Sequence, residues 1–210
     1  MAPGRLVVAT RNEHKLHELE QILSEVELVP LPDDVGLPPE TGDTFEANAL
    51  IKARAAATAT GRAAVADDSG IEAAALGGAP GVWSARYAGE RATDGENLSK
   101  LLRDVPGRGD RRVAYVCALA YAEPGGREEV VQGRCEGLLA LEPRGHGGFG
   151  YDPAFVPDDY GDGRTMAELS PAEKDAISHR GRAARALVDR LTEAHARRRG
   201  RGRRSVGGRR

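Results

Sequence analysis

The sequence predicts an α/β fold with a mixed, elongated central sheet flanked by helices. In the first half of the chain, short apolar runs alternate with helical patterns, beginning with Leu6–Ala9 and the spaced leucines that follow it. In the second half, the strand-like runs Arg112–Tyr121 and Glu128–Leu141 are joined by Glu-Pro-Gly-Gly-Arg, a hairpin signal. Strand–helix alternation favours parallel pairing and a hairpin requires antiparallel pairing, so we expect both in one sheet.

The length of 210 residues suits one domain whose core is large enough to be divided into two lobes. We find no internal repeat, so residues 1–196 are predicted to form a single domain. Hydrophobic residues make up 40% of the chain and charged residues 30%, which is typical of soluble globular proteins. No apolar run approaches the length of a membrane span, and the N-terminal residues lack the architecture of a signal peptide. We therefore expect a cytoplasmic location without membrane contact.

Charge is distributed unevenly along the chain. The last segment, residues 197–210, holds eight arginines and no acidic residue. Without it, the body has 22 basic and 32 acidic residues, a net charge near −10. Such a body is not expected to bind nucleic acid. The tail is predicted to be disordered, and either contacts RNA or acidic surfaces weakly or is a solvated extension. Cys117 and Cys135 are too few for a structural zinc site and suit a reduced core.

Lysine is rare in this sequence. Only four of the 30 basic residues are lysines, namely Lys15, Lys52, Lys100 and Lys174. Because arginine serves nearly everywhere else, the lysines are candidates for positions that need a compact, flexible ammonium, such as a phosphate contact. A chance distribution could give the same pattern.

The stretch Ala-Asp-Asp-Ser-Gly at residues 66–70 is the central candidate for a functional site. The apolar run Ala63–Ala66 predicts a buried strand, and because aspartate and glycine are poor strand residues, we expect the strand to end at Asp67. In open α/β sheets, ligands bind at this end of a strand. Neighbouring strand residues point to opposite faces, so Asp67 and Asp68 should have different roles. The alternative is an Asx turn that only closes a strand.

The polar turn Thr10–Lys15 is a second candidate. It joins the first strand to a helix, an arrangement that offers backbone N–H groups and a positive helix end to an anion. Thr10 and Asn12 could supply hydrogen bonds and Lys15 a charge. Alternatively, Asn12 is an ordinary N-cap and Lys15 is solvated.

A third candidate lies on the alanine-rich helix predicted from about Phe45 to Thr60. Asn48 and Lys52 are four residues apart and therefore share one face of this helix. Glu40, in the loop before the helix, could face the same cleft as a metal ligand. The alternative is a solvated loop acid and a surface pair.

The later part of the chain contains a glycine cluster with aromatic residues, His146–Phe155. Glycines let the backbone approach a ligand closely, and aromatic rings can stack on a base, although a plain loop is also possible. Ser170–Glu173 is a capping box that predicts a helix start, and Thr93 or Asp94 should cap another helix. The final helix is expected from about 182 to 196.

Taken in order, five motifs resemble those of the noncanonical purine NTP pyrophosphatases, which remove deaminated purine nucleotides. They are TRNEHK, ETGDTFEANALIKA, ADDSG followed by GGAPGVWSARYAG, GGFGYDP, and EKDAISHRG, and the resemblance covers residues 5–192. It implies an α/β fold of two lobes with an active-site cleft between them. It also implies Mg²⁺-dependent hydrolysis of ITP, dITP and XTP to the monophosphate and pyrophosphate, by a homodimer.

The resemblance also implies roles for individual residues. The catalytic residues would be Asp68, its partner Asp67, and Lys52, with Asp68 and Glu40 as Mg²⁺ ligands. The substrate would be bound by Thr10, Arg11, Asn12, Glu13, His14, Lys15, Asn48, Ser69, Phe149, Gly150, Tyr151, Asp152, Lys174, His179 and Arg180.

The sequence departs from the family pattern at two positions and in its tail. Ala47 stands where many relatives carry an acid, so any metal or water role there must shift to Glu46 or Glu40, or vanish. Trp83 replaces another large residue, and the arginine tail lies outside the pattern. Two other functions stay open: a pyrophosphatase for other abnormal nucleotides, such as modified pyrimidines, and a nucleotide-binding or RNA-associated regulator without catalysis.

Overall fold

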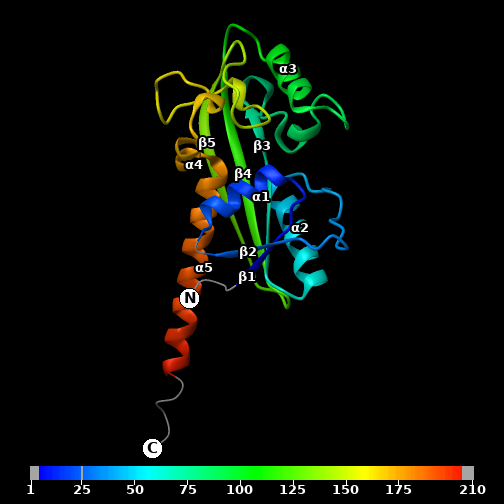
Figure 1. The fold of residues 1–210 in the computed structure, drawn as a ribbon, viewed down its shortest axis with the longest axis vertical. Helices are drawn as coiled ribbons and strands as arrows, with labels where there is room; N and C mark the ends of the chain where they lie inside the picture. Colours follow the sequence, from blue (N-terminus) through cyan, green and yellow to red (C-terminus); the bar gives the residue numbers. More distant parts are fainter. Residues whose placement is uncertain (1–4, 25, 205–210) are drawn as a thin grey trace, which may run out of the picture.

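A six-stranded sheet forms the centre of the molecule in the computed structural model, which describes residues 5–24 and 26–204 (Figure 1). The strand order is β2-β1-β3-β4-β5-β6. β1 pairs in parallel with β2 and β3, whereas β3 to β6 pair antiparallel, which confirms the predicted mixed α/β sheet. The strands are β1 (Arg5–Val8), β2 (Glu27–Pro30), β3 (Ala64–Ala73), β4 (Arg112–Ala122), β5 (Glu128–Leu139) and β6 (Phe155–Pro157).

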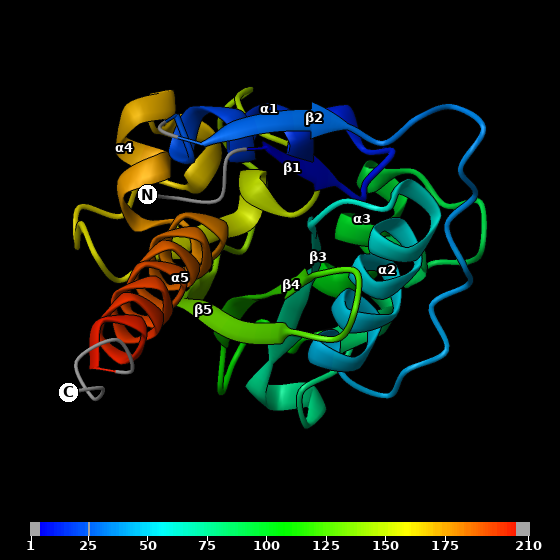
Figure 2. The same ribbon diagram turned by 90° about the horizontal axis from the view of Figure 1, so that it is seen from below.

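Helices cover both faces of the sheet. α1 and α5 lie on one face and α2 on the other, while α3 lies at one end (Figures 1 and 2). The helices are α1 (Glu13–Ile22), α2 (Phe45–Thr60), α3 (Asp94–Asp104), α4 (Pro171–Ile177) and α5 (His179–Arg204). Short 3-10 turns occupy Ala74–Leu76, Gly81–Arg86, Asp152–Ala154 and Met166–Glu168.

Side-chain alternation along β4 builds two separate cores. Cys117, Leu119 and Tyr121 face α1 and α5, whereas the small residues at positions 118, 120 and 122 face α2. Small side chains on the second face let the alanine-rich helix α2 lie close to the strands. A third apolar cluster joins α3 to the far ends of β4 and β5.

Strand β3 is longer than the sequence predicts. It continues through Asp67, Asp68, Ser69 and Gly70 to Ala73, so the acids lie within the strand and not at its end. β4 provides the reason, because it pairs with β3 over the whole length from Ala64 to Ala73. β1, by contrast, ends beside Val65, so the acids lie just beyond the carboxyl end of the parallel pair. Tertiary pairing thus overrides the low strand propensity of aspartate and glycine.

The start of α5 is held against β5 at Gly133. A Cβ atom at this position would lie 2.1 Å from the carbonyl oxygen of His179 and 2.5 Å from the backbone nitrogen of Ala183. Only glycine permits this approach, which brings the first turn of α5 over the sheet. The helix therefore begins at His179, before the expected residue 182, and delivers His179 and Arg180 to the centre of the molecule.

The end of α5 also differs from the expectation. The helix continues to Arg204, so residues 197–204 are helical where disorder is predicted, and residues 205–210 lie outside the described residues. Arginine is a good helix former, and an existing helix is extended more easily than a new one is nucleated. Within the described residues, no helix is both long and apolar enough to cross a membrane.

Candidate active site

A cavity of about 330 Å³ lies where β1 ends, β3 passes, and the segments around residues 150 and 179 meet. Most of the predicted site residues line it. They are Thr10, Arg11, Asn12, His14, Lys15, Glu40, Lys52, Asp68, Ser69, Phe149, Gly150, Tyr151, Asp152, Lys174, His179 and Arg180. Glu13, Asn48 and Asp67 are not part of its wall. Whether the molecule is divided into two lobes at this cavity stays a prediction.

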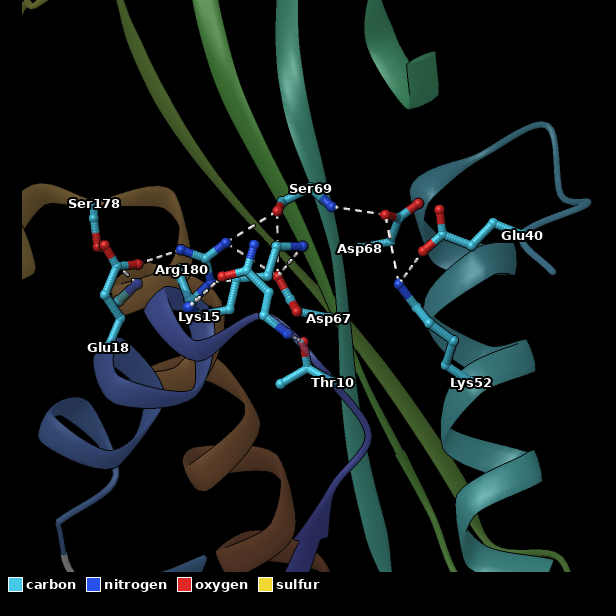
Figure 3. Close-up of polar contacts among 12 residues, drawn as sticks. Thr10, Lys15, Glu18, Glu40, Lys52, Asp67, Asp68, Ser69, Ser178 and Arg180 are labelled. Atoms are coloured by element: carbon cyan, nitrogen blue, oxygen red, sulfur yellow. Dashed lines mark hydrogen bonds and ion pairs between the residues drawn. The ribbon is translucent and has the colours of Figure 1, made fainter. Parts of the chain in front are cut away.

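Asp67 points toward α1 and α5, on the same side of β3 as Val65. Its Oδ2 atom lies 3.0 Å from the Lys15 ammonium and 3.1 Å from the Arg180 guanidinium, and it accepts a hydrogen bond from the Ser69 hydroxyl (Figure 3). Burial alone would raise the pKa of Asp67, but the two cations outweigh it and hold that pKa well below its usual range. Asp67 is therefore a charged anchor for Lys15 and Arg180.

Asp68 points to the opposite face, toward α2. Its Oδ2 accepts a hydrogen bond of 3.0 Å from the Asn48 amide. Its Oδ1 lies 3.7 Å from the Lys52 ammonium (Figure 3). Burial raises the pKa of Asp68, and the nearby Lys52 only partly opposes this. Two adjacent carboxyl groups on opposite faces of the strand thus have pKa values shifted in opposite directions. Asp68, which lines the cavity, is the one suited to accept a proton.

Asn48 holds Asp68 through a hydrogen bond and does not itself line the cavity. Its amide donates to Asp68, and its carbonyl oxygen accepts a 2.7 Å hydrogen bond from the backbone of Gly42. Both ends of this buried amide are therefore occupied by protein. In this structure, the Asn48 amide contacts Asp68 and Gly42 and does not line the cavity, and a direct substrate contact stays a prediction.

Lys52 and Glu40 complete this side of the cavity. The Lys52 ammonium contacts both Glu40 and Asp68, and burial, which would lower its pKa, is outweighed by the surrounding carboxylates. Glu40 and Asp68 thus flank a single cation. Mg²⁺ prefers carboxylates together with phosphate oxygens and water as ligands, so Glu40 and Asp68 fit a magnesium ion that binds with a phosphate. Among the described residues, no cluster of three or more potential metal ligands is found.

The turn before α1 agrees with the interpretation of Asn12 as an N-cap but not with that of Lys15 as a solvated residue. Asn12 is the N-cap of α1, because its side chain accepts a hydrogen bond from the Lys15 backbone, and Thr10 accepts one from Asn12. Lys15, however, is not solvated: its side chain is 17% exposed and paired with Asp67. Arg11 donates to the carbonyl oxygens of Leu31, Pro32 and Val35, and so fastens the following loop beside the cavity.

An aromatic and acidic group forms the other end of the cavity. Phe149 stacks on His14, with 5.2 Å between ring centroids, and the Lys174 ammonium lies 4.8 Å from the Phe149 centroid. Asp152 accepts hydrogen bonds from Lys174, from the Phe149 backbone and from the Tyr115 hydroxyl. These bonds fix the loop that carries Phe149 and leave one face of the site lined by a ring and a cation.

Glu18 is a member of the site that sequence reasoning missed. It accepts hydrogen bonds from Lys174 (2.8 Å) and Arg180, and thereby ties α1 to α4 and α5. Burial would raise the pKa of Glu18, but the two cations lower it overall. Glu18 is three residues after Lys15 on one helix face, which is the available sequence signal. Nothing in the pattern connects it to residues 174 and 180, which are more than 150 positions away.

His179 is a buried neutral group in the cavity wall. Its ring stacks on Tyr115 with 4.7 Å between centroids, and burial, reinforced by Arg180 and Lys174, puts its pKa well below the usual value. The Nδ1 atom has no hydrogen-bond partner among the described residues. A buried polar atom without a partner is costly, and Nδ1 is not open to the cavity in this structure.

Other residues of the cavity wall carry no motif in the sequence. Tyr115, Asp94 and Asn97 line the cavity, and Asp94 accepts a hydrogen bond from the Gly150 backbone. Trp83 does not line this cavity and is 57% exposed. Its ring contacts Arg86 instead.

The arrangement defines a class of protein. One end of the cavity holds the carboxylates of Asp68 and Glu40 and the Lys52 ammonium, which suit phosphate chemistry. The other end holds the Phe149 ring, the Lys174 ammonium and polar groups, which suit a flat heterocycle. Such a cavity is that of a nucleotide-binding hydrolase.

The comparisons identify the family. A model of the Ham1 family matches residues 6–190, and the chain belongs to this family. The chain is 55% identical over 197 residues to the dITP/XTP pyrophosphatase of Mycobacterium tuberculosis H37Rv, covering 89% of this chain and 95% of that one. The corresponding Frankia alni protein is 53% identical, covering 90% and 98%. A HAM1 protein structure from Coxiella burnetii matches with a TM-score of 0.83 at 45% identity, covering 90% and 99%.

Proposed function

We propose that this protein hydrolyses noncanonical purine nucleoside triphosphates, dITP, ITP and XTP, to the nucleoside monophosphate and pyrophosphate. The observation that carries this function is that one cavity joins Asp68, Lys52 and Glu40 to Phe149, Lys174 and His179. Family membership and relatives named dITP/XTP pyrophosphatase support the same reaction. Its consequence in the cell is removal of deaminated purines from the nucleotide pool.

In the reaction, a water molecule attacks the α-phosphorus. The new bond forms between the water oxygen and phosphorus, and the bond from phosphorus to the bridging oxygen breaks. Pyrophosphate leaves with the electron pair, and Asp68 accepts a proton from the water. Asn48 orients the carboxylate for this task through its amide. Asp67 stays ionised and keeps Lys15 and Arg180 in place.

Charge neutralisation is the main requirement of such a site. A nucleoside triphosphate carries about four negative charges, which a body with net charge near −10 binds only if cations are concentrated locally. Lys15 and Lys52 supply two of them, and the N-terminus of α1 adds a partial positive charge. Mg²⁺ held by Glu40 and Asp68 would supply the rest and polarise the phosphoryl oxygens.

Base recognition is assigned to the opposite end. Hypoxanthine and xanthine present a 6-oxo acceptor, whereas adenine presents an amino donor. Arg180, His179 and Lys174 are donors or can act as donors near this end, and Phe149 offers its ring face. Hydrogen-bond donors at this end of the cavity therefore favour 6-oxopurines over adenine.

The test is product analysis. The full-length protein is incubated with dITP, XTP, GTP and ATP plus Mg²⁺, and monophosphate and pyrophosphate are quantified. Release of dIMP and pyrophosphate in equal amounts is expected. Survival of all four nucleotides would reject the proposed activity and favour the nucleotide-binding regulator. A separate incubation with a modified pyrimidine nucleoside triphosphate tests the other pyrophosphatase, which faster hydrolysis than that of dITP would favour. A Mg²⁺ requirement and a homodimer belong to the proposal as expectations from the family resemblance, and a cytoplasmic location belongs to it as an expectation from the sequence.

A further inference from the structure

A second pocket adjoins the active-site cavity. It opens on the surface and shares Leu37, Glu40 and Lys52 with the cavity, to which it adds Trp83, Arg86 and Glu90. The shared residues Glu40 and Lys52 are those that flank Asp68 at the phosphate end. The two pockets therefore meet at Glu40 and Lys52.

Arg86 is the cation of the outer pocket. Its side chain is 23% exposed, lies 3.9 Å from Glu40 and 3.7 Å from Glu90, and rests over the Trp83 ring at 4.4 Å. Its guanidinium forms no hydrogen bond to any residue in the described ranges. Arg180 and Arg111, by contrast, each donate several. Arg86 thus holds a fixed position with its hydrogen-bond donors free.

The charges of this region call for an anion. Lys52 is already shared between Glu40 and Asp68, so it cannot by itself compensate a pyrophosphate group. If the base lies at Phe149 and the α-phosphorus at Asp68, a triphosphate that continues along the cavity wall places its β- and γ-phosphates at Glu40 and Lys52. A guanidinium binds phosphate oxygens with two parallel hydrogen bonds, and stacking on an aromatic ring keeps its plane oriented.

We propose that the outer pocket is the binding site of the leaving pyrophosphate, with Arg86 as its principal ligand. This inference rests on the proposed function and names the part of the site that holds the leaving group. Arg86 exchanges its long contacts with Glu40 and Glu90 for hydrogen bonds to phosphate oxygens. It stabilises the negative charge that builds up as the bond to the bridging oxygen breaks, and it holds the product until release.

Trp83 provides a direct readout, because it is the only tryptophan in the chain and contacts Arg86. Inorganic pyrophosphate with Mg²⁺ is titrated into the full-length protein, and tryptophan fluorescence is recorded. A saturable change is expected for the unaltered protein. For Arg86→Gln, the affinity should fall at least about tenfold, as expected for loss of hydrogen bonds to a charged group. The control Arg91→Gln changes an exposed arginine outside both pockets and should leave the titration unchanged.

Enzyme kinetics give the second readout. Inhibition of dITP hydrolysis by added pyrophosphate should weaken in Arg86→Gln by a similar factor, while inhibition by dIMP should not change. Arg86→Lys keeps the positive charge but loses the two parallel N–H donors of the guanidinium, so its pyrophosphate inhibition should be intermediate. This variant replaces Arg86→Gln in the test if Arg86→Gln does not fold. Equal loss of pyrophosphate and dIMP binding, unaltered pyrophosphate binding, or the absence of a saturable titration would overturn the proposal. An unaltered protein that binds pyrophosphate but releases none from dITP would contradict the proposed function alone.

Discussion

At the scale of single residues, the adjacent carboxylates of Asp67 and Asp68 in β3 have different functions. Asp67 is fixed by Lys15 and Arg180 on one face, and Asp68 is held by Asn48 near Lys52 on the other. The first remains charged and organises cations, whereas the second borders the cavity and can take up a proton. Strand geometry therefore gives adjacent, chemically identical side chains different surroundings and different functions.

Asp68→Asn tests this division. The amide keeps the shape and the burial of the side chain but cannot accept a proton from water, so kcat for dITP should fall about 100-fold or more. The melting temperature, measured by circular dichroism, should stay close to that of the unaltered protein. A folded variant with near-normal kcat would remove Asp68 from the mechanism.

Glu18→Gln tests the second acidic anchor. Loss of its charge leaves Lys174 and Arg180 less compensated in a largely buried place, so the free energy of unfolding at pH 7 should fall by about 1–3 kcal/mol. The folded-state pKa of Glu18 is lowered. Its contribution is therefore complete above the unfolded-state pKa near 4.3 and is lost as the pH falls through the folded-state value.

The difference between Glu18→Gln and the unaltered protein should accordingly be largest at neutral pH and shrink below about pH 4. Urea unfolding at several pH values measures it. Glu20→Gln, an exposed residue of the same helix, is the matched control and should show no difference at any pH. A Glu18→Gln deficit that is independent of pH would mean that packing, and not charge, explains the role of Glu18.

At the scale of secondary structure, local signals predict the helices well. The capping residues Thr93 and Ser170 begin α3 and α4 as expected, and α2 spans the predicted Phe45–Thr60. These features depend on neighbours within a few residues. The extension of β3 to Ala73 depends on pairing with β4, about 40 to 50 residues away in the sequence, and no local pattern predicts it. The early start of α5 likewise depends on a glycine in another strand.

The candidate site follows the same rule. Residues that lie in a motif, such as Lys15, Asp68 and Phe149, are recognised from the sequence and line the cavity. Glu18 and Tyr115 join the site through contacts between distant elements, with Lys174 and Asp152 respectively. Long-range contacts of this kind are set by the packing of the whole fold and leave no periodic trace in the sequence.

Gly133→Ala tests the contact between β5 and α5. The added methyl group would meet backbone atoms that cannot move without shifting the helix, so a loss of stability of about 1–3 kcal/mol is expected. Since the same helix turn carries His179 and Arg180, the catalytic efficiency for dITP should fall too. Urea unfolding and steady-state kinetics measure the two effects.

Gly95→Ala is the control for this substitution. A Cβ atom there meets nothing within 4 Å, and the residue lies inside α3, so alanine should be neutral or stabilise by up to about 1 kcal/mol. If Gly133→Ala behaved like this control, the close approach of α5 to β5 would not be required for folding.

At the scale of the whole molecule, the C-terminal part of α5 stands apart from the rest. The helix runs beyond the sheet (Figure 1), and over residues 179–194, whose burial is described, Leu191 is the last buried apolar residue. A chain that ends at Ala196 should therefore keep the melting temperature and the dITP turnover of the full protein. Differential scanning calorimetry and product analysis check both. A large loss of thermal stability would show that the arginine-rich segment docks on the acidic body.

Substrate selectivity is a property of the whole cavity, because both of its ends must be satisfied at once. All nucleoside triphosphates present the same phosphates to Lys15 and Lys52, so discrimination comes from the base end. A donor aimed at the 6-oxo group of hypoxanthine meets another donor when adenine enters, and one buried polar group then lacks a partner. Sites built in this way reject the wrong ligand by roughly 10⁴-fold.

We therefore expect dITP, ITP and XTP to have the highest kcat/KM, GTP a much lower value, and ATP the lowest. GTP shares the 6-oxo group, so only its 2-amino group can be rejected, by a clash or an unpaired N–H, and that exclusion should be weaker. Parallel kinetics with the five nucleotides decide the order. Arg180, which is buried against Asp67 and Glu18, is held too firmly to adapt to an adenine amino group. Comparable efficiencies for ATP and ITP would contradict this and indicate a general nucleotide pyrophosphatase.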